Sequence, residues 1–134
     1  MENLNPKKMR VSFDFDDCLN DNIHMQTLAQ ILVGAGIDVF ILSARDNDGH
    51  IRNDDLWKRA EELGIPKSRC IFVNESPKHL AMREHNITIH FDDNADTVDR
   101  INRFFDTPHS LNKRALLVNL DLSDIVNTWH NLLD

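Results

Sequence analysis

The chain alternates between short apolar segments and longer segments in which apolar residues recur every three to four positions. The short segments are rich in branched and aromatic side chains and are predicted as buried strands: residues 11–15, 38–42, 70–73, 87–91 and 115–118. The longer segments are predicted as helices: residues 23–32, 56–63, 76–84, 95–105 and 122–133. Parallel neighbouring strands need a connection of about a dozen residues, which is usually helical. The alternation therefore predicts an α/β fold, a doubly wound, Rossmann-like sheet of five parallel strands in three layers.

Length and charge restrict the classes of protein to which the chain can belong. Its 134 residues suit a single domain, which we expect to span residues 1–134. The 22 acidic and 15 basic residues give a net charge of −7, which argues against broad binding of nucleic acid or anionic membrane but not against a local basic site. No apolar run approaches the roughly 20 residues that span a bilayer, and the first residues do not resemble a signal peptide. We expect a cytoplasmic protein with no membrane partner.

Acidic side chains gather where the predicted strands end. In doubly wound sheets the ligand lies outside the carboxyl ends of the strands, where the winding direction reverses. Asp14 and Asp16 lie at the end of the first predicted strand, and side-chain alternation predicts that both point to the same side of the sheet. Asp93 follows the fourth strand and completes a cage of oxygen ligands, which favours Mg²⁺ over Zn²⁺. For any one of these acids alone, a helix cap or a solvated turn is the commoner role.

Four segments in order resemble the motifs of the haloacid dehalogenase superfamily of phosphohydrolases. They are VSFDFDDCL, FILS, Lys78 and IHFDD, and the resemblance covers roughly residues 9–100. Cys18 departs from the pattern, since the family commonly has Thr or Val there. The chain has no room for the cap domains of larger members. A capless member implies an open site, which suits a phosphoprotein or a nucleic-acid end, unless a partner subunit supplies a lid.

The resemblance implies a two-step phosphomonoester hydrolysis that depends on Mg²⁺. Asp14 is implied as the nucleophile, which forms an aspartyl-phosphate, and Asp16 as the general acid and base. Ser43 is implied to donate to a phosphoryl oxygen and Lys78 to offset negative charge, although a turn cap and a solvated first-turn residue are their simpler roles. The implied metal ligands are Asp14, Asp16, Asp92 and Asp93.

The segment Ser43-Ala44-Arg45 resembles the SxR element of polynucleotide 3'-phosphatases, and FDDNADTVDRI resembles their fourth motif and the helix after it. The expected substrate is therefore a nucleotide or a polynucleotide-end phosphate. Ser43, Ala44, Arg45 and Lys78 are the expected substrate-binding residues. An ion pair of Arg45 with Asp46 or Asp48 is the commoner role of such a loop arginine. The loop of residues 45–52 also carries His50 and Arg52, to which no role is assigned.

The same residues are compatible with other substrates, another reaction and a non-catalytic function. The substrate is alternatively a small phosphorylated metabolite or a phosphoprotein, and the reaction is alternatively phosphotransfer. A non-catalytic module that senses phosphate or metal, similar to receiver domains, would carry an Asp after the third strand, where this chain has Val73-Asn74-Glu75. The oligomeric state is left open.

The remaining residues of interest are given structural roles. The cysteines and histidines show no metal-ligand spacing. We expect the thiols of Cys18 and Cys70 to be reduced. We expect His79, His85 and His90 to lie at the surface or in packing contacts. Asp17, Asp21 and Asp96 are expected at turns and in the first turn of a helix. Trp57 and Trp129 are expected in the core. The sequence shows no interleaving of aromatic and basic residues that would predict a base-stacking surface.

Overall fold

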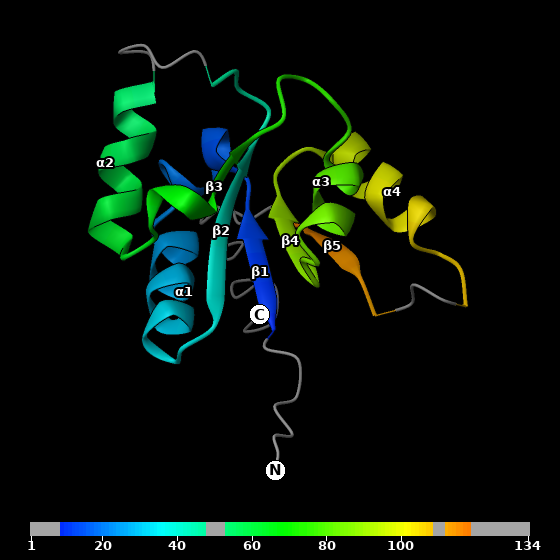
Figure 1. The fold of residues 1–134 in the computed structure, drawn as a ribbon, viewed down its shortest axis with the longest axis horizontal. Helices are drawn as coiled ribbons and strands as arrows, with labels where there is room; N and C mark the ends of the chain where they lie inside the picture. Colours follow the sequence, from blue (N-terminus) through cyan, green and yellow to red (C-terminus); the bar gives the residue numbers. More distant parts are fainter. Residues whose placement is uncertain (1–8, 48–52, 109–111, 119–134) are drawn as a thin grey trace, which may run out of the picture.

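Five parallel strands form one sheet in the order β3-β2-β1-β4-β5 (Figure 1). The computed structural model describes residues 9–47, 53–108 and 112–118. The strands are β1 (Arg10–Phe13), β2 (Asp38–Ser43), β3 (Cys70–Phe72), β4 (Ile89–Asp92) and β5 (Arg114–Leu117). The helices are α1 (Ile23–Gly34), α2 (Asp54–Leu63), α3 (Lys78–Glu84) and α4 (Ala95–Phe104), with the short helical turns η1 (Phe15–Leu19) and η3 (Lys67–Arg69). The predicted α/β class with a five-stranded parallel sheet is confirmed.

The winding direction of the sheet reverses at β1. From β1 the chain moves outward through β2 to β3, and then returns to place β4 on the other side of β1. The carboxyl ends of β1 and β4 therefore lie side by side in the middle of the sheet. This is the position at which doubly wound proteins bind their ligands.

The predicted boundaries of the described strands and helices are correct to within two residues, and two of the differences have clear physical reasons. The strand predicted for residues 11–15 ends at Phe13, because the chain then leaves the sheet and winds into η1, with a positive φ of 56° at Asp17. The helix predicted from residue 76 begins at Lys78, since Pro77 still has an extended backbone. The predicted helix of residues 122–133, Trp129 and the loop residues 48–52 lie outside the described residues.

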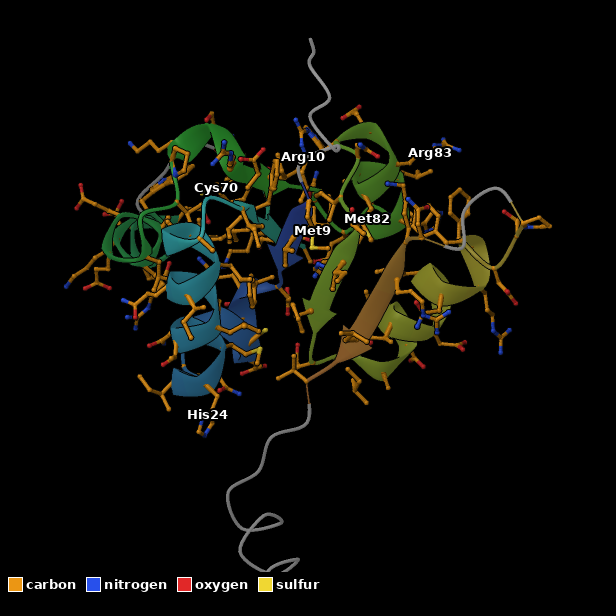
Figure 2. All side chains as sticks on the ribbon, turned by 90° about the horizontal axis from the view of Figure 1, so that it is seen from below. Met9, Arg10, His24, Cys70, Met82 and Arg83 are labelled. Carbon is orange, nitrogen blue, oxygen red and sulfur yellow. The ribbon has the colours of Figure 1, made fainter. Side chains whose placement is uncertain are left out.

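Alternate side chains of the strands enter two separate cores. Helices α1 and α2 cover one face of the sheet and α3 and α4 cover the other (Figures 1 and 2). Under α1 and α2, Val11 and Phe13 of β1 join Val39 and Ile41 of β2 in the larger apolar cluster, in which Phe13 also stacks on Phe91 of β4. Under α3 and α4 the apolar cluster is smaller, and its buried members are Phe40, Leu42, Met82, Ile87, Ile101, Phe105 and Ala115.

Caps fix where the helices begin and end. Asn22 accepts hydrogen bonds from the backbone N–H groups of the first turn of α1, and Asn94 accepts one in the first turn of α4. Gly64 ends α2 with a φ of +81°, a left-handed conformation that glycine adopts without strain. The predicted helix end at Gly64 is confirmed.

Both cysteines are buried free thiols. Burial raises the pKa of each, that of Cys70 to about 11, so both thiols stay neutral near pH 7. Within the described ranges, no helix combines the length and the apolar composition that crossing a bilayer requires.

Candidate active site

Three of the predicted site residues meet at the carboxyl edge of the central strands. Asp14 directly follows β1, Ser43 ends β2 and Asp92 ends β4, and all three are buried. The backbone N–H of Asp14 donates to the carbonyl of Phe91 at 2.8 Å, so the pairing of β1 with β4 extends as far as this acid. The position of the Asp14 carboxylate is thus set by the sheet itself, with 7% of the residue exposed.

Lys78 joins the acids of the two strands. Its ammonium group donates to Asp14 Oδ1 at 2.7 Å and to Asp92 Oδ2 at 2.8 Å. Although burial lowers the pKa of Lys78, the two carboxylates outweigh that effect and raise it. The lysine therefore stays charged. The prediction that Lys78 lies in the site and offsets negative charge at Asp14 agrees with this geometry, which differs from that of a solvated first-turn residue.

The acids at this edge carry more negative charge than one lysine neutralises. Oxygen atoms of Asp14, Asp92 and Asp93 lie within 4.8 Å of one another. Burial raises the pKa of Asp14 to about 7, the charge of Lys78 opposes the rise and the Asp92 carboxylate adds to it. An oxygen-only donor set with excess negative charge fits a hard divalent cation such as Mg²⁺. Asp14, Asp92 and Asp93 are the residues that would hold it.

Two residues that sequence reasoning left out of the site fix the orientation of Asp92. His90 is fully buried, and its Nε2 lies 2.8 Å from Asp92 Oδ2, while its Nδ1 lies 2.7 Å from Ser12 Oγ. Burial lowers the pKa of His90, so the ring is neutral. A carboxylate only accepts, so Nε2 donates to Asp92 and the Ser12 hydroxyl donates to Nδ1. We call the chain Ser12, His90, Asp92, Lys78 and Asp14 the polar column.

The polar column keeps Asp92 ionised. Burial alone would raise the pKa of this carboxyl, but the hydrogen bond from His90 and the charge of Lys78 hold it at about 2. The backbone N–H of Asn94 donates to the other oxygen at 3.0 Å. Asp92 is therefore a fixed negative charge in a fixed orientation. The expectation that His90 lies at the surface or in a packing contact is corrected, because it belongs to this hydrogen-bonded chain.

The structure does not bring Asp16 to the other acids. Both of its carboxylate oxygens accept from Arg45, at 3.0 Å from Nε and 2.7 Å from Nη2. The same guanidinium group binds both oxygens of Asp55, at 2.7 and 2.9 Å, and lies over the Phe15 ring. Asp16 is thus not among the acids whose oxygen atoms lie within 4.8 Å of one another, and its role as a metal ligand stays a prediction. Because β1 stops at Phe13, strand alternation does not extend to Asp16.

Arg45 lies at the site, but with partners that the sequence did not predict. Two partners were expected for Arg45. Asp46 does not form an ion pair with it within the described part of the chain, and Asp48 lies outside the described residues. Asp16 and Asp55 do form ion pairs with it. Ser43 is fully buried, and its hydroxyl accepts the backbone N–H of Arg45 at 3.1 Å. This hydrogen bond is the turn cap considered for Ser43. Ala44 is half-buried and lines a pocket next to Lys78.

The other candidate residues lie where their simpler roles predict. Asp17, Asp21 and Asp96 are exposed. Trp57 is half-buried against the α1 and α2 core and meets Phe72 edge to face. These residues do not enter the candidate site.

No family model matches the chain, and a search of curated proteins finds no similar sequence. The assignment of the site therefore depends on the residues described above.

Proposed function

We propose that the protein is a Mg²⁺-dependent phosphomonoester hydrolase of the haloacid dehalogenase type, with Asp14 as the nucleophile. One observation carries the proposal: a buried aspartate at the end of the central strand contacts a lysine and lies within 4.8 Å of two further acids. A structural salt bridge needs one acid for one lysine. The additional acids suit a cation and a phosphoryl group that arrive together.

In the first step an oxygen of Asp14 attacks phosphorus and the bond from phosphorus to the ester oxygen breaks. The leaving oxygen takes a proton from Asp16, so an alcohol departs and an aspartyl-phosphate remains. Lys78 is already in contact with Asp14 and offsets the charge on the attacked group. A bound Mg²⁺ supplies Lewis-acid stabilisation of the phosphoryl oxygens.

In the second step water attacks the phosphorus of the aspartyl-phosphate, and Asp16 takes the proton from the water. The bond from phosphorus to the aspartyl oxygen breaks, so inorganic phosphate leaves and the Asp14 carboxylate is restored. The fixed negative charge of Asp92 keeps Lys78 in place through both steps. The neutral His90 ring holds Asp92 in its orientation.

Arg45 controls when Asp16 is free for proton transfer. Both oxygens of Asp16 are engaged by the guanidinium group, so this pair opens before Asp16 reaches the leaving oxygen. An incoming phosphate competes for the same guanidinium, because arginine binds phosphate and carboxylate in the same forked geometry. Half of the Asp16 side chain is exposed, which leaves room for this rearrangement. Asp55 still holds Arg45 in position while Asp16 is released.

The favoured substrate is a nucleotide or a polynucleotide end, because Ser43, Ala44 and Arg45 resemble the SxR element of polynucleotide 3'-phosphatases. Small phosphorylated metabolites and phosphoproteins are the alternative substrates of the same chemistry. A non-catalytic sensing module would bind Mg²⁺ without turnover. Release of inorganic phosphate distinguishes the hydrolase from such a non-catalytic module.

Hydrolysis of para-nitrophenyl phosphate with Mg²⁺, and with a chelator in its place, tests the proposal. We expect activity only with Mg²⁺, and losses of at least about 10³-fold for Asp14→Asn and Asp16→Asn. Asp17→Asn is the matched control: it makes the same chemical change in an exposed neighbour, and asparagine tolerates its positive φ.

Two results would count against the hydrolase. One is full activity in Asp14→Asn. The other is an inactive wild type with this compound and with mononucleotides and oligonucleotides phosphorylated at either end.

A further inference from the structure

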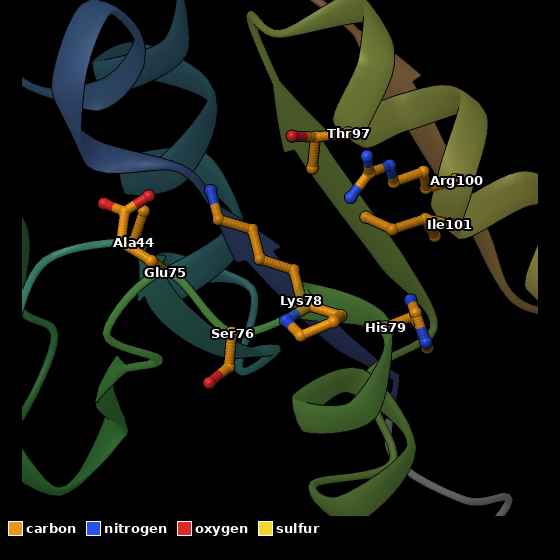
Figure 3. A pocket seen from close by; sticks show the side chains of 9 residues that line it. Ala44, Glu75, Ser76, Lys78, His79, Thr97, Arg100 and Ile101 are labelled. Atoms are coloured by element: carbon orange, nitrogen blue, oxygen red, sulfur yellow. The ribbon is translucent and has the colours of Figure 1, made fainter.

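A pocket of about 200 Å³ opens beside the proposed reaction centre, between the start of α3 and the inner face of α4 (Figure 3). It shares Lys78 and Ala44 with the site, and the two reaction steps make no use of the rest of it. Pockets that hold an entire small ligand measure roughly 300–1,000 Å³. This pocket is therefore suited to one group of a substrate whose reacting phosphate lies at Asp14.

The far wall of the pocket presents an arginine. Thr97, Arg100 and Ile101 are spaced three and four residues apart, so they share one face of α4, and Figure 3 shows them projecting towards Lys78. Arg100 is exposed, and no described residue forms a hydrogen bond or an ion pair with it. Its neighbour on the helix, Arg103, is paired with Asp99 at 2.9 Å and does not line the pocket. The two arginines of one helix thus differ in whether a protein acid already neutralises them.

Asp96 precedes Arg100 by four residues in α4, but no acid of the described residues forms an ion pair with Arg100. Lys78 is neutralised by Asp14 and Asp92 and has no charge to spare for a second anion. Burial lowers the pKa of His79, and the charges of Arg83 and Arg100 lower it further. The acid among the described lining residues, Glu75, is exposed and lies across the pocket from Arg100 (Figure 3). The net charge of the chain is −7, so an arginine that lines a pocket without an ion-pair partner among the described residues is a specific feature.

We propose that this pocket binds a second phosphate group of the substrate, with Arg100 as its cationic ligand and the Thr97 hydroxyl as a further donor. The proposal rests on the proposed function, because it takes the first phosphate to be the one that reacts at Asp14. Arginine binds phosphate through two parallel hydrogen bonds, which also fixes the orientation of the ligand. The second phosphate belongs either to a bisphosphorylated nucleotide or to the phosphodiester next to the terminal phosphate of a single strand.

A matched pair of substrates tests the pocket. A nucleoside 3'-monophosphate and the corresponding 3',5'-bisphosphate differ only in the second phosphate, and a single-stranded oligonucleotide with a 3'-terminal phosphate represents the other source. For Arg100→Gln we expect the KM of the bisphosphate, the oligonucleotide or both to rise about ten-fold. The kcat for the bisphosphate and the oligonucleotide should stay within about two-fold of the wild-type value. For the monophosphate, both kcat and KM should stay within about two-fold of the wild-type values. Arg103→Gln is the control, because it removes the same charge from the same helix outside the pocket.

The outcomes separate the two proposals. A ten-fold effect with the bisphosphate supports a free nucleotide as the source of the second phosphate, and an effect with the oligonucleotide alone supports a strand. The pocket is rejected if Arg100→Gln and Arg103→Gln behave alike with both, or if Arg100→Gln impairs the monophosphate equally. If the wild type hydrolyses none of them, the assay with para-nitrophenyl phosphate still tests the hydrolase, and calorimetric titration with the bisphosphate tests the pocket independently. Binding about ten-fold weaker in Arg100→Gln alone supports the pocket, and equal or absent binding rejects it.

Discussion

The two faces of the sheet use alternate residues of the same strands but differ in chemistry. Towards α1 and α2, β1 presents Val11 and Phe13, which belong to the larger apolar core. Towards α3 and α4, the same strand presents Ser12, which meets His90 of β4 in a buried hydrogen bond. We call these the apolar face and the polar face. One strand thus supplies both the core and the support of the candidate site.

The difference shows how a small domain separates stability from function. The apolar face buries side chains that gain free energy on folding and make no specific hydrogen bonds. The polar face buries five polar side chains, each of which needs its partners, because an unpaired buried polar group costs about 1–3 kcal/mol. A change on the apolar face should therefore alter stability with little effect on chemistry. A change on the polar face should alter both.

On the apolar face, Phe13→Ala should have the largest effect on stability. Phe13 is fully buried and stacks on Phe91, so its truncation should lower the free energy of unfolding by about 3–5 kcal/mol. Urea unfolding measures this loss. Hydrolysis per folded molecule should stay within a few-fold of the wild type, and Mg²⁺ should stabilise the variant as much as the wild type. A variant that folds normally and loses its activity would contradict the separation of the two faces.

On the polar face, Lys78→Met should lower the free energy of unfolding by about 3 kcal/mol, because it leaves the Asp14 and Asp92 carboxylates together without their cation. In contrast with Phe13→Ala, Mg²⁺ should restore much of this loss, since a divalent cation binds the same acids. Thermal unfolding with and without Mg²⁺ measures the difference. If Mg²⁺ stabilised Lys78→Met no more than it stabilises Phe13→Ala, the cation would not bind at these acids.

Ser12→Ala should lower the free energy of unfolding by about 1–3 kcal/mol, although it makes the interior more apolar. The change removes the hydroxyl that donates to His90 Nδ1 and leaves a buried ring nitrogen without a partner. Denaturant unfolding measures the loss. Ser68→Ala is the control at an exposed serine, where the expected change is within about 0.5 kcal/mol. Equal stability of Ser12→Ala and the wild type would mean that the polar column does not need its end member.

At the rim of the sheet, outside both faces, Asp55→Asn should have the smallest effect, below about 1 kcal/mol. The hydrogen bonds from Arg45 lower the pKa of Asp55 from 3.8, but 56% of the side chain is exposed and solvent screens the pair. The lowered pKa makes this stabilisation present above pH 3.8 and lost as the pH falls below it. Unfolding at pH 7 and at pH 3 measures the change.

Asp54→Asn is the control for Asp55→Asn. Both acids lie in the first turn of α2 and interact with the helix dipole, and only Asp55 binds Arg45. A difference between the two variants that persists at low pH would contradict the assignment to the ion pair.

Much of the fold follows from the sequence because the apolar pattern is strong. The run DVFILS is buried at every position, which is typical of a central parallel strand, and the structure places β2 there. Asp14 and Asp93 were predictable because acids at the ends of parallel strands converge at one edge of the sheet. Lys78 was predictable only from its order among the motifs.

The polar column and the Arg45 contacts were not predictable from local patterns. Side-chain alternation predicts that successive residues of a strand point to opposite faces of the sheet. Only the register of β1 against β4 shows that Ser12 and His90 are neighbours. The partner of Arg45 depends on where α2 begins, which brings Asp55 to the site across the loop. The pocket at Arg100 depends on the packing of α3 against α4, which sequence periodicity does not determine.

If Asp14 is the nucleophile, it carries a phosphoryl group during turnover, and this group can be trapped chemically. The wild type is mixed with para-nitrophenyl phosphate and Mg²⁺, quenched in acid and treated with borohydride, which reduces an acyl phosphate to an alcohol. Peptide mass spectrometry then identifies the altered residue. We expect Asp14 to be converted to homoserine only when substrate is present. Turnover with Asp14 unmodified, or reduction at another aspartate, would contradict this role of Asp14.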